Sequence, residues 1–318
     1  MYPGGIMLAN VVALKADIAV NENSAIKASA IEISAIMVSY MTGPALFESI
    51  AAVMNDPDIF ELILIDNGND IETRRTLKEL EKKHKNLVIV KGHGNIGFSK
   101  ANNLGVTFAQ KDYLLFVNPD AVLRSKTARK LAECGENLKQ PWITGGMLRF
   151  SSGQEQRGAR REALTPWTAV KSFTPLHKLP FMSSIHLEKK PVPKQSSAMP
   201  VVSGACMMVC RTSFDMLGGF DEDFFLHVED IDLCRRATEA GGEVYFVPDA
   251  NVIHYGSTSS VRRGKVEWEK SKGFITYFRK HAKTRFGRFL VTLASPLIIL
   301  AIMGRAWCIG LRQALIGR

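Results

Sequence analysis

The sequence predicts an α/β protein in which a mostly parallel central sheet carries helices on both faces. Short apolar segments alternate with helical segments from residue 33 to residue 117, and polar residues follow the ends of the apolar segments. Strands that alternate with helices are joined by right-handed crossovers, which cover both faces of a parallel sheet. Two further parts interrupt or follow this pattern: a proline-rich stretch over residues 150–200 and a basic, apolar tail after residue 256.

The N-terminal half contains four expected strands, over residues 33–40, 60–65, 87–90 and 113–117. The first helix follows Pro44, a residue suited to a first helical turn, and its Leu46, Ile50 and Val53 recur at the spacing of one helix face. A charged surface helix is expected over residues 72–84 and a buried helix over residues 99–110. These segments complete the alternation that predicts the sheet.

The C-terminal half opens with a stretch of different texture. Residues 150–200 hold six of the 13 prolines and show no sustained period, which favours a long insertion over the sheet face, as a lid or as an acceptor-side loop. An apolar strand then starts at Gly204, and a loop rich in Gly, Phe and acid leads to a helix that opens on Glu229 and Asp230. A last strand is expected over residues 243–247.

Polar or aromatic residues stand at or just beyond the ends of the four N-terminal strands: Tyr40, Asp66, Asn95 and Asp120. Each alone could be a turn residue that binds its own backbone. Because the carboxyl ends of parallel strands meet at one edge of the sheet, the four together predict a ligand pocket there. The glycine-rich loop over residues 92–105 lacks the spacing of a dinucleotide-binding loop and of a Walker A motif.

The acidic helix start allows two interpretations. Glu229, Asp230 and Asp232 could only complement the positive end of the helix dipole, which is common. Alternatively, one of these carboxylates is a general base, since a base must stand on a rigid element within reach of the hydroxyl that it deprotonates.

The positive charge of the chain lies in its tail. From Gly256 onward there are 13 basic and two acidic residues, a surplus of 11, while the whole chain carries +10. The tail continues into an uncharged apolar run over residues 289–303, which nucleic-acid-binding arms lack, so an anionic membrane surface is the expected partner and nucleic acid is not. The run is short and contains Pro296, which favours an interfacial or re-entrant segment over a span. The alternatives are a span that continues through Ile316, if Arg305 snorkels, and a helix packed on the protein's own core.

The cysteines and the N-terminus bear on the compartment. Five cysteines without a metal-type CxxC pair suit a reducing cytosol better than a disulfide framework. Residues 1–30 are expected to be an extension without a charged-then-apolar secretory signal. We therefore expect a cytoplasmic protein, held at the inner face of the plasma membrane by its tail.

Five motifs in order resemble the family 2 inverting glycosyltransferases with the A-type fold, and bacterial rhamnosyltransferase-like members in particular. The resemblance runs from about Ile33 to His254, and its most specific part is the GGFDE…EDxDLxxR pattern. The motifs are LIDNGND, GNIGFSKANNLG, Asn118-Pro119-Asp120, the segment from VSGACMMVCRTSF to RRATEAGG, and FVPDANVIH.

The resemblance implies a nucleotide-sugar pocket at the predicted sheet edge. Tyr40 matches the residue that lies against the base and Asp66 the one that hydrogen-bonds it; Asn95, Gly97 and Asn118 complete the expected donor-binding set.

The resemblance also implies metal-binding and catalytic residues. Asp120 matches the last carboxylate of a metal-binding DxD motif, in which Asn118 replaces the first Asp, and His254 matches a histidine of the metal or diphosphate site. The expected cofactor is Mg²⁺ or Mn²⁺, because a diphosphate leaving group needs a hard cation with oxygen ligands. Asp230, preceded by Glu229, matches the catalytic base. His254 alone would more often be a structural histidine.

The implied reaction is inverting transfer of a sugar to a hydroxyl of a glycan or polyprenyl-linked acceptor in the synthesis of bacterial cell-surface polysaccharide. dTDP-rhamnose is the favoured donor, and UDP-hexose or UDP-N-acetylhexosamine are alternatives within the family. A catalytically silent nucleotide-sugar-binding protein should have lost Asp120 or Asp230, and both are present. A nucleotidylyltransferase would need a basic phosphate-binding loop near the N-terminus, where the sequence has none.

The expected domain organisation follows from these assignments. The glycosyltransferase domain comprises residues 31–256, with a nucleotide-binding half over 31–120, the proline-rich insertion over 150–200 and an acceptor and catalytic half over 201–256. Membrane-associating helices follow over residues 257–318.

Overall fold

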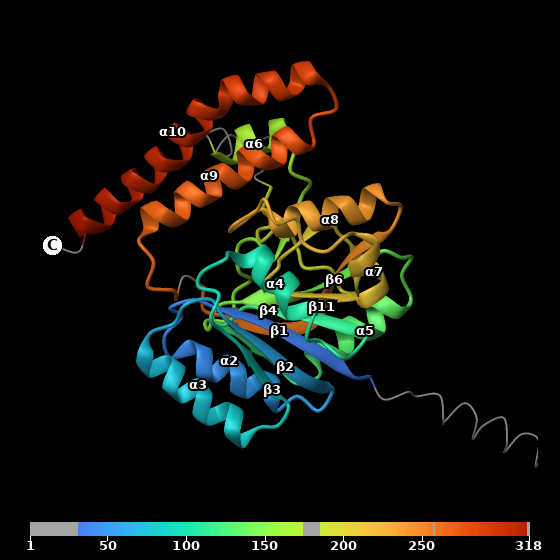
Figure 1. The fold of residues 1–318 in the computed structure, drawn as a ribbon. Coiled ribbons are helices and arrows are strands. Elements are labelled where there is room, and N and C mark those ends of the chain that lie inside the picture. The colour runs from blue at the N-terminus through green and yellow to red at the C-terminus, as the bar shows by residue number, and fades with distance from the viewer. Residues whose placement is uncertain (1–30, 174–184, 257, 317–318) are drawn as a thin grey trace, which may run out of the picture. The chain divides into compact units, whose positions relative to one another are not determined.

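The computed structural model describes residues 31–173, 185–256 and 258–316, so the expected N-terminal extension over residues 1–30 lies outside the described residues. Within these ranges, nine strands form one sheet and two short strands, β7 and β9, form a second (Figure 1). The large sheet has the order β3 (Leu87–Val90), β2 (Ile59–Asp66), β1 (Ile33–Ser39), β4 (Tyr113–Val117), β10 (Cys206–Cys210), β6 (Trp142–Arg149), β11 (Glu243–His254) and β5 (Ala121–Leu123), with β8 (Ser197–Ala198) paired to β11.

The sheet is mostly parallel, as predicted. Strands β1 to β4 are parallel neighbours, and β6 runs parallel to β11. Strand β10 is antiparallel to both β4 and β6, while β5 and β8 are antiparallel to β11. Since β10 runs against its neighbours, its first residues lie at the same sheet edge as the last residues of β4, β6 and β11. That edge therefore collects residues from both halves of the chain.

Helices cover both faces of the sheet, which confirms the predicted fold class. In Figure 1, α2 (Ala45–Met54) and α3 (Ile71–Lys83) lie on one face, and α4 (Phe98–Val106) and α8 (Glu229–Glu239) on the other. All seven residues of β1 are buried, as expected for a strand covered on both sides. The remaining helices of the core are α5 (Thr127–Glu136), α6 (Pro166–Phe173) and α7 (Arg211–Met216).

The surface helix α3 shows how local sequence sets an element's ends. The Asp70 carboxylate accepts a hydrogen bond from the Thr73 backbone N–H at 2.8 Å, which caps the helix start. Lys82 and Lys83 stand in the last turn, where positive charge complements the helix dipole. Only Thr73 and Leu77 are buried in this helix, in agreement with its predicted surface position.

The described part of the segment between β6 and β10 holds little regular structure. It contains β7 (Arg160–Arg161) and α6, and β7 pairs with β9 (Val201–Val202) in the small sheet. The buried pair of Arg160 and Glu155 anchors this segment, with both side chains less than 10 % exposed and Nε and Oε1 2.8 Å apart.

The tail forms two long helices, α9 (Arg263–Lys280) and α10 (Arg285–Ile316), which pack against each other (Figure 1). Phe274 and Tyr277 of α9 are buried in the same apolar cluster as Ile231 and Leu233 of α8. Ile302 of α10 also joins this cluster. Helix α9 is therefore part of the core around α8.

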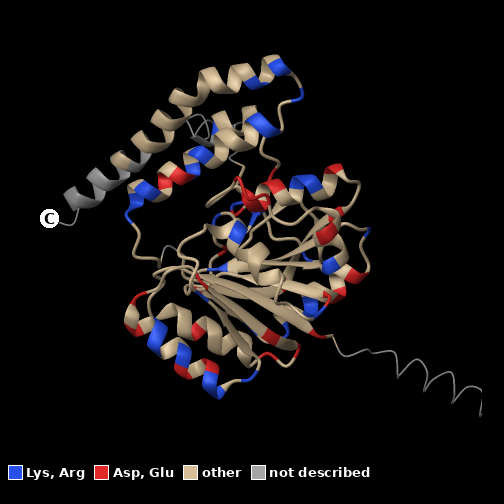
Figure 2. Cartoon of the chain, viewed as in Figure 1, with Lys and Arg blue, Asp and Glu red and all other residues tan. Residues whose placement is uncertain are grey.

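Helix α10 runs without a break through Pro296. Among the described residues, its segment from Arg285 to Gly304 is long and apolar enough to cross a membrane, and only 6 % of its most apolar window is buried. Six large apolar side chains in this segment are between 45 and 69 % exposed: Phe286, Phe289, Leu290, Leu293, Leu297 and Leu300. Figure 2 shows basic residues at the start of α10 and mostly uncharged residues in the turns that follow.

The contact between α4 and β1 leads to a stability prediction. A Cβ atom added to Gly105 would stand 2.5 Å from Cγ2 of Ile36, a β-branched residue held in the central strand. We expect Gly105→Ala to lower the free energy of unfolding by about 1–3 kcal/mol, because an overfilled core must shift. The matched control is Gly264→Ala in α9, where an added Cβ meets nothing within 4 Å, so unfolding should be unchanged or slightly less favourable. Urea denaturation of the two variants tests this, and equal stabilities would contradict the tight packing.

Candidate functional site

A cavity of about 410 Å³ lies at the sheet edge where β4, β10 and β11 meet. Four of the predicted site residues line it together: Asn118, Glu229, Asp230 and His254. Asn118 follows β4 and His254 ends β11, while the two acids open α8. The Ala205 carbonyl, just before β10, accepts a hydrogen bond from the Asn118 N–H at 3.0 Å, which joins the two halves of the chain at this point.

Two residues with strained backbone stand directly before the acidic first turn of α8. His227 and Val228 have φ values of 69° and 77°, a region that β-branched residues such as valine rarely adopt. Such residues cost on the order of 1–3 kcal/mol each and persist only where the surroundings enforce them. One such contact comes from α9, where a Cβ on Gly273 would stand 2.9 Å from the His227 carbonyl oxygen. In Figure 2, the first turn of α8 is the acidic segment between the sheet and α9.

Asp230 is fixed by three neighbouring groups. Its Oδ2 accepts hydrogen bonds from the Gly204 N–H at 3.1 Å and from the Arg161 guanidinium, and its Oδ1 accepts one from the Ile231 N–H at 2.8 Å. Only 13 % of its side chain is exposed. The carboxylate predicted to be a base is therefore rigidly oriented at the cavity wall.

Glu229 has a different environment from its neighbour. Its side chain is buried and its Oε2 has no hydrogen-bond partner. Burial, together with the nearby Asp230 charge, raises the pKa of Glu229 to about 8. At neutral pH this carboxyl group is mostly protonated, so it can donate a hydrogen bond into the cavity.

Asp232 does not line the cavity and acts in the structure of α8. Burial raises the pKa of this carboxyl, but hydrogen bonds from His281 and Arg236 outweigh burial and lower it. Its oxygens lie 2.8 Å from His281 Nε2 and 2.7 Å from Arg236 Nε. Asp232 therefore fits the interpretation of an acid that stabilises the helix, and these contacts give it no catalytic role.

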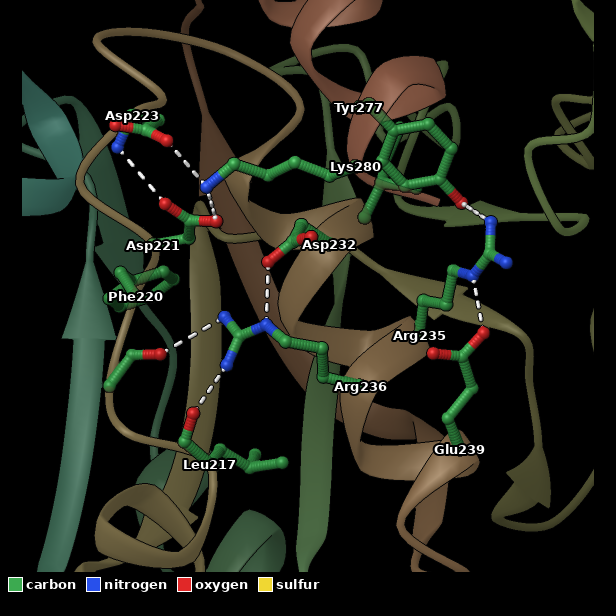
Figure 3. Close-up of polar contacts among 12 residues, drawn as sticks. Leu217, Phe220, Asp221, Asp223, Asp232, Arg235, Arg236, Glu239, Tyr277 and Lys280 are labelled. Carbon is green, nitrogen blue, oxygen red and sulfur yellow. Dashed lines mark hydrogen bonds and ion pairs between the residues drawn. The ribbon is translucent and has the colours of Figure 1, made fainter. Parts of the chain in front are cut away.

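Figure 3 shows how α9 is joined to α8 and to the loop before it. Lys280 of α9 bridges Asp221 and Asp223 of that loop, the second with an N–O distance of 2.6 Å. Tyr277 of α9 accepts a hydrogen bond from Arg235 of α8, at 3.2 Å. The tail therefore supports the element that carries the acidic turn.

Asp120 and His254 form the part of the site that could hold a metal. Asp120 Oδ1 lies 3.1 Å from His254 Nε2, and its Oδ2 accepts a hydrogen bond from Thr258 at 2.9 Å. Burial raises the pKa of Asp120, but the contacts from His254 and Thr258 outweigh burial and lower it. Asp120 does not itself line the cavity, but it contacts His254, which does.

The hydrogen bond made by Nδ1 of His254 determines that Nε2 is the nitrogen available to a metal ion. His254 Nδ1 contacts Oε1 of Gln156, which can only accept a hydrogen bond, so Nδ1 carries a proton and Nε2 faces Asp120. A histidine held in this way by its other nitrogen is typical of a metal ligand. No group of three or more His, Cys, Asp or Glu side chains suited to a metal occurs in the described part of the chain. Two protein ligands fit a cation that completes its shell with phosphate oxygens and water.

The predicted base-binding residues lie further along the same edge. Asp66 accepts hydrogen bonds from the Asn69 N–H at 2.8 Å and from Arg74 at 3.0 Å, and it lines a second cavity of about 310 Å³. The Tyr40 ring lies against Gly68, where an added Cβ would stand 3.2 Å from it. Asp66 therefore has satisfied hydrogen bonds within its turn, and the structure does not bring it into the cavity of Asp230.

Asn95 and Gly97 connect this edge to the loop before α8. Asn95 Oδ1 accepts hydrogen bonds from the Gly97 N–H at 3.1 Å and from Asn67 at 3.2 Å. Gly97 has a φ of 89°, and an added Cβ would stand 2.7 Å from the Phe225 carbonyl oxygen. Only glycine fits this position, because the two loops touch through their backbones. Neither residue lines either of these two cavities.

Several cavity residues were not predicted from the sequence: Gln156, Arg157, Arg161, His227 and Lys270. Three of them belong to the segment without a period, and Lys270 belongs to the basic tail. His227 is half-buried, and desolvation together with the nearby Lys270 lowers its pKa to about 4. The only signal in the sequence for His227 was its place two residues before the Glu-Asp pair.

Comparison with known proteins identifies the family. A family model described as "Glycosyltransferase like family 2" matches residues 32–276. The rhamnosyltransferase WbbL of Escherichia coli is 26 % identical over 242 residues, which are 73 % of this chain and 82 % of that protein. The N-acetylglucosaminyl-diphospho-decaprenol L-rhamnosyltransferase of Mycobacterium tuberculosis is 26 % identical over 247 residues, 71 % of this chain and 77 % of its own.

Solved structures show the same fold at low identity. The mannosyltransferase PcManGT of Pyrobaculum calidifontis, in complex with GDP-Man and Mn²⁺, has a TM-score of 0.52 at 13 % identity and covers 90 % of this chain and 76 % of its own. GalNAc-T7 with UDP, GalNAc and Mn²⁺ has a TM-score of 0.55 at 14 % identity, with 72 % of this chain and 44 % of that one covered. Because the family match spans well over half of its length, the chain belongs to the glycosyltransferase-like family 2, with rhamnosyltransferases among its relatives, as its motifs indicated.

Proposed function

We propose that this glycosyltransferase transfers a sugar from a nucleotide-sugar donor to an acceptor hydroxyl with inversion at the anomeric carbon. The observation that carries the proposal is that Asp230 and His254 line the same cavity, and that His254 pairs with Asp120 of the N-terminal half. A base on one side and a diphosphate site on the other suit direct displacement, in which the hydroxyl attacks opposite the leaving group.

The relatives support a choice of donor and acceptor. One is named a dTDP-rhamnosyl transferase, from Shigella flexneri, at 23 % identity over 233 residues. The name of the Mycobacterium tuberculosis relative specifies a diphospho-polyprenol glycan as its acceptor. By analogy, we favour dTDP-rhamnose as donor and a polyprenyl-linked glycan of cell-surface polysaccharide synthesis as acceptor, with UDP-hexose and UDP-N-acetylhexosamine as alternative donors.

Asp230 is proposed to take the proton of the attacking hydroxyl. A sugar hydroxyl is a poor nucleophile at neutral pH, so one oriented carboxylate lowers the barrier. The strained backbone at Val228 and the Gly204 N–H hold this carboxylate in one orientation. Glu229 stays protonated beside it and is suited to donate a hydrogen bond to an acceptor oxygen, which would orient the hydroxyl.

The leaving group is proposed to bind at the other wall of the cavity. Asp120 and His254 would hold Mg²⁺ or Mn²⁺, which when bound stabilises the negative charge of the diphosphate. Asn118 Nδ2 lies 3.3 Å from His254 Nε2, beside the imidazole in the cavity wall. A general acid for the leaving group is unnecessary in such a site, in contrast to glycoside hydrolysis.

Helix α10 is proposed to attach the enzyme to the cytoplasmic face of the plasma membrane. Its exposed apolar side chains follow a basic segment that contains Arg285 and Arg288, the arrangement typical of binding to anionic lipid surfaces. An enzyme at the surface meets a lipid-linked acceptor by search in two dimensions. The exposed leucines would lie in the acyl region and the arginines among the headgroups.

Substitution of the two aspartates should separate chemistry from donor binding. We expect Asp230→Asn to reduce turnover by about 10²–10⁴-fold with donor affinity unchanged, because only proton transfer is lost. Asp120→Ala should instead weaken donor binding in the presence of Mn²⁺ by about tenfold or more. Asp249→Asn, at an exposed position in β11, is the control and should behave as wild type. Single-turnover kinetics and calorimetry distinguish the two effects, and near-normal turnover of Asp230→Asn would refute the assignment of the base.

The buried carboxyl of Glu229 should make stability depend on pH. Its pKa is raised on folding, so the unfolded chain loses this proton first as pH rises, and stability falls between about pH 4.5 and pH 8. Glu229→Gln should therefore stabilise the protein at pH 8 by on the order of 3 kcal/mol and have little effect near pH 4.5. Urea denaturation at both pH values measures this. Glu239→Gln, an exposed acid of the same helix, is the control and should show no such change; a gain at pH 8 as small as that of the control would disprove the burial of a protonated Glu229.

Removing the apolar face of α10 should release the enzyme from membranes. Leu293, Leu297 and Leu300 are each 67 to 69 % exposed. We expect their joint replacement by Gln to weaken vesicle binding by at least about tenfold, since each leucine side chain buried in lipid contributes roughly 1.5–3 kcal/mol. Joint replacement by Met keeps the apolar area and should preserve binding. Flotation with anionic and neutral vesicles measures the effect, and a wild-type protein that stays wholly unbound would exclude attachment through α10.

A further inference from the structure

Among the described residues, Arg161 makes the one ion pair that involves the proposed base. Its guanidinium contacts Asp230 Oδ2, and both side chains are less than 15 % exposed. Arg161 stands on β7, in the proline-rich segment, whereas Asp230 opens α8. The pair therefore joins the insertion to the catalytic turn inside the cavity.

This ion pair occupies one oxygen of the proposed base. Oδ2 accepts hydrogen bonds from Arg161 and from Gly204, which fill both of its acceptor sites, whereas Oδ1 accepts one hydrogen bond, from Ile231. The Gly204 and Ile231 donors are fixed backbone groups. Arg161 is the donor that a side-chain rotation can remove.

Arg161 is itself incompletely satisfied. Among the described residues, its buried Nε has no hydrogen-bond partner, and its Nη2 makes a further, long hydrogen bond of 3.4 Å to the Val202 carbonyl. Arg157 and Lys270 line the same cavity and add positive charge to it. A guanidinium with an unused N–H in a basic cavity is suited to a phosphate group, which it can bind through two parallel hydrogen bonds.

We propose that Arg161 is a positioning residue that exchanges partners during the reaction: it pairs with Asp230 in the free enzyme and turns to a phosphate group of the acceptor when that substrate binds. The exchange releases Asp230 Oδ2 only when an acceptor is present. The inference rests on the proposed function, because it assumes Asp230 as the base. We assign the phosphate to the acceptor because Arg161 lies at the Asp230 wall, whereas the donor diphosphate is proposed at the His254 wall.

The partner exchange can be tested by binding, without turnover. Inorganic pyrophosphate, with EDTA to exclude metal, is titrated by calorimetry into the full-length protein and its variants. In wild type the probe must compete with Asp230 for Arg161. We expect Asp230→Asn to bind pyrophosphate about tenfold more tightly, because it frees the guanidinium, and the double variant Asp230→Asn, Arg161→Met to lose that gain.

Two matched variants complete the binding test. Adding Lys190→Met to Asp230→Asn removes an exposed positive charge of the same segment and should leave the gain intact. Adding Arg161→Lys should keep part of it. A double variant with Arg161→Met that binds as tightly as Asp230→Asn alone would overturn the proposal, since the probe would then owe its gain to lost repulsion alone.

Kinetics then separate acceptor from donor. In Arg161→Met we expect the KM for the acceptor to rise about tenfold with the KM for the donor unchanged. Donor hydrolysis without acceptor should rise, because the unpaired Asp230 can take a proton from water as its oxygen joins the anomeric carbon and the nucleoside diphosphate leaves. A raised donor KM, or a parallel fall of hydrolysis and transfer, would contradict the exchange. A wild-type enzyme that transfers no sugar would refute the proposed function but not the binding result.

Discussion

The site depends on two adjacent residues, His227 and Val228, whose backbone adopts the left-handed conformation just before α8. This turn projects the following two carboxylates toward the sheet edge instead of leaving them on the helix surface. The strain persists because neighbouring elements enforce it: α9 approaches at Gly273, and Val228 is buried in the core. The geometry of the acidic turn is thus a product of tertiary packing and not of helix propensity.

Three acids within one helical turn have three separate environments. Glu229 is buried, its Oε2 has no partner and it retains its proton; Asp230 pairs with an arginine; and Asp232 contacts Arg236 and His281. Desolvation and specific partners, rather than position along the sequence, decide how each group behaves. An acid that merely stabilises a helix and an acid suited to catalysis can therefore stand two residues apart.

Much of the fold could be predicted from the sequence, because apolar periodicity records which faces are buried. The strands over residues 87–90 and 113–117 were predicted with the bounds that the structure has, since each is a short apolar run between turns. The antiparallel insertion of β10 between β4 and β6 could not be predicted, because strand order depends on contacts between distant residues. Pro296 favoured an interfacial or re-entrant segment over a span, and in the structure α10 continues through it as one helix.

The candidate site was predictable where a motif is local and not where the fold brings distant residues together. Asn118, Asp230 and His254 were found from strand ends and family motifs, and all three line one cavity. Arg161 and Gln156 lie in a segment without a period, so nothing local marked them. Their role follows only from the placement of that segment over the edge where β4 and β11 end.

Helix α9 belongs to both the tail and the cavity, and this sets where the chain can be shortened. A protein ending near Gly256 would lack Phe274 and Tyr277, which fill the core beside α8, as well as the glycine that approaches the His227 carbonyl. Its interior would be open and the acidic turn unsupported. A shortened form for crystallisation should therefore retain the chain through His281, whose imidazole contacts Asp232. Ending the chain before Arg285 would remove α10 and uncover the part of the core where Ile302 packs.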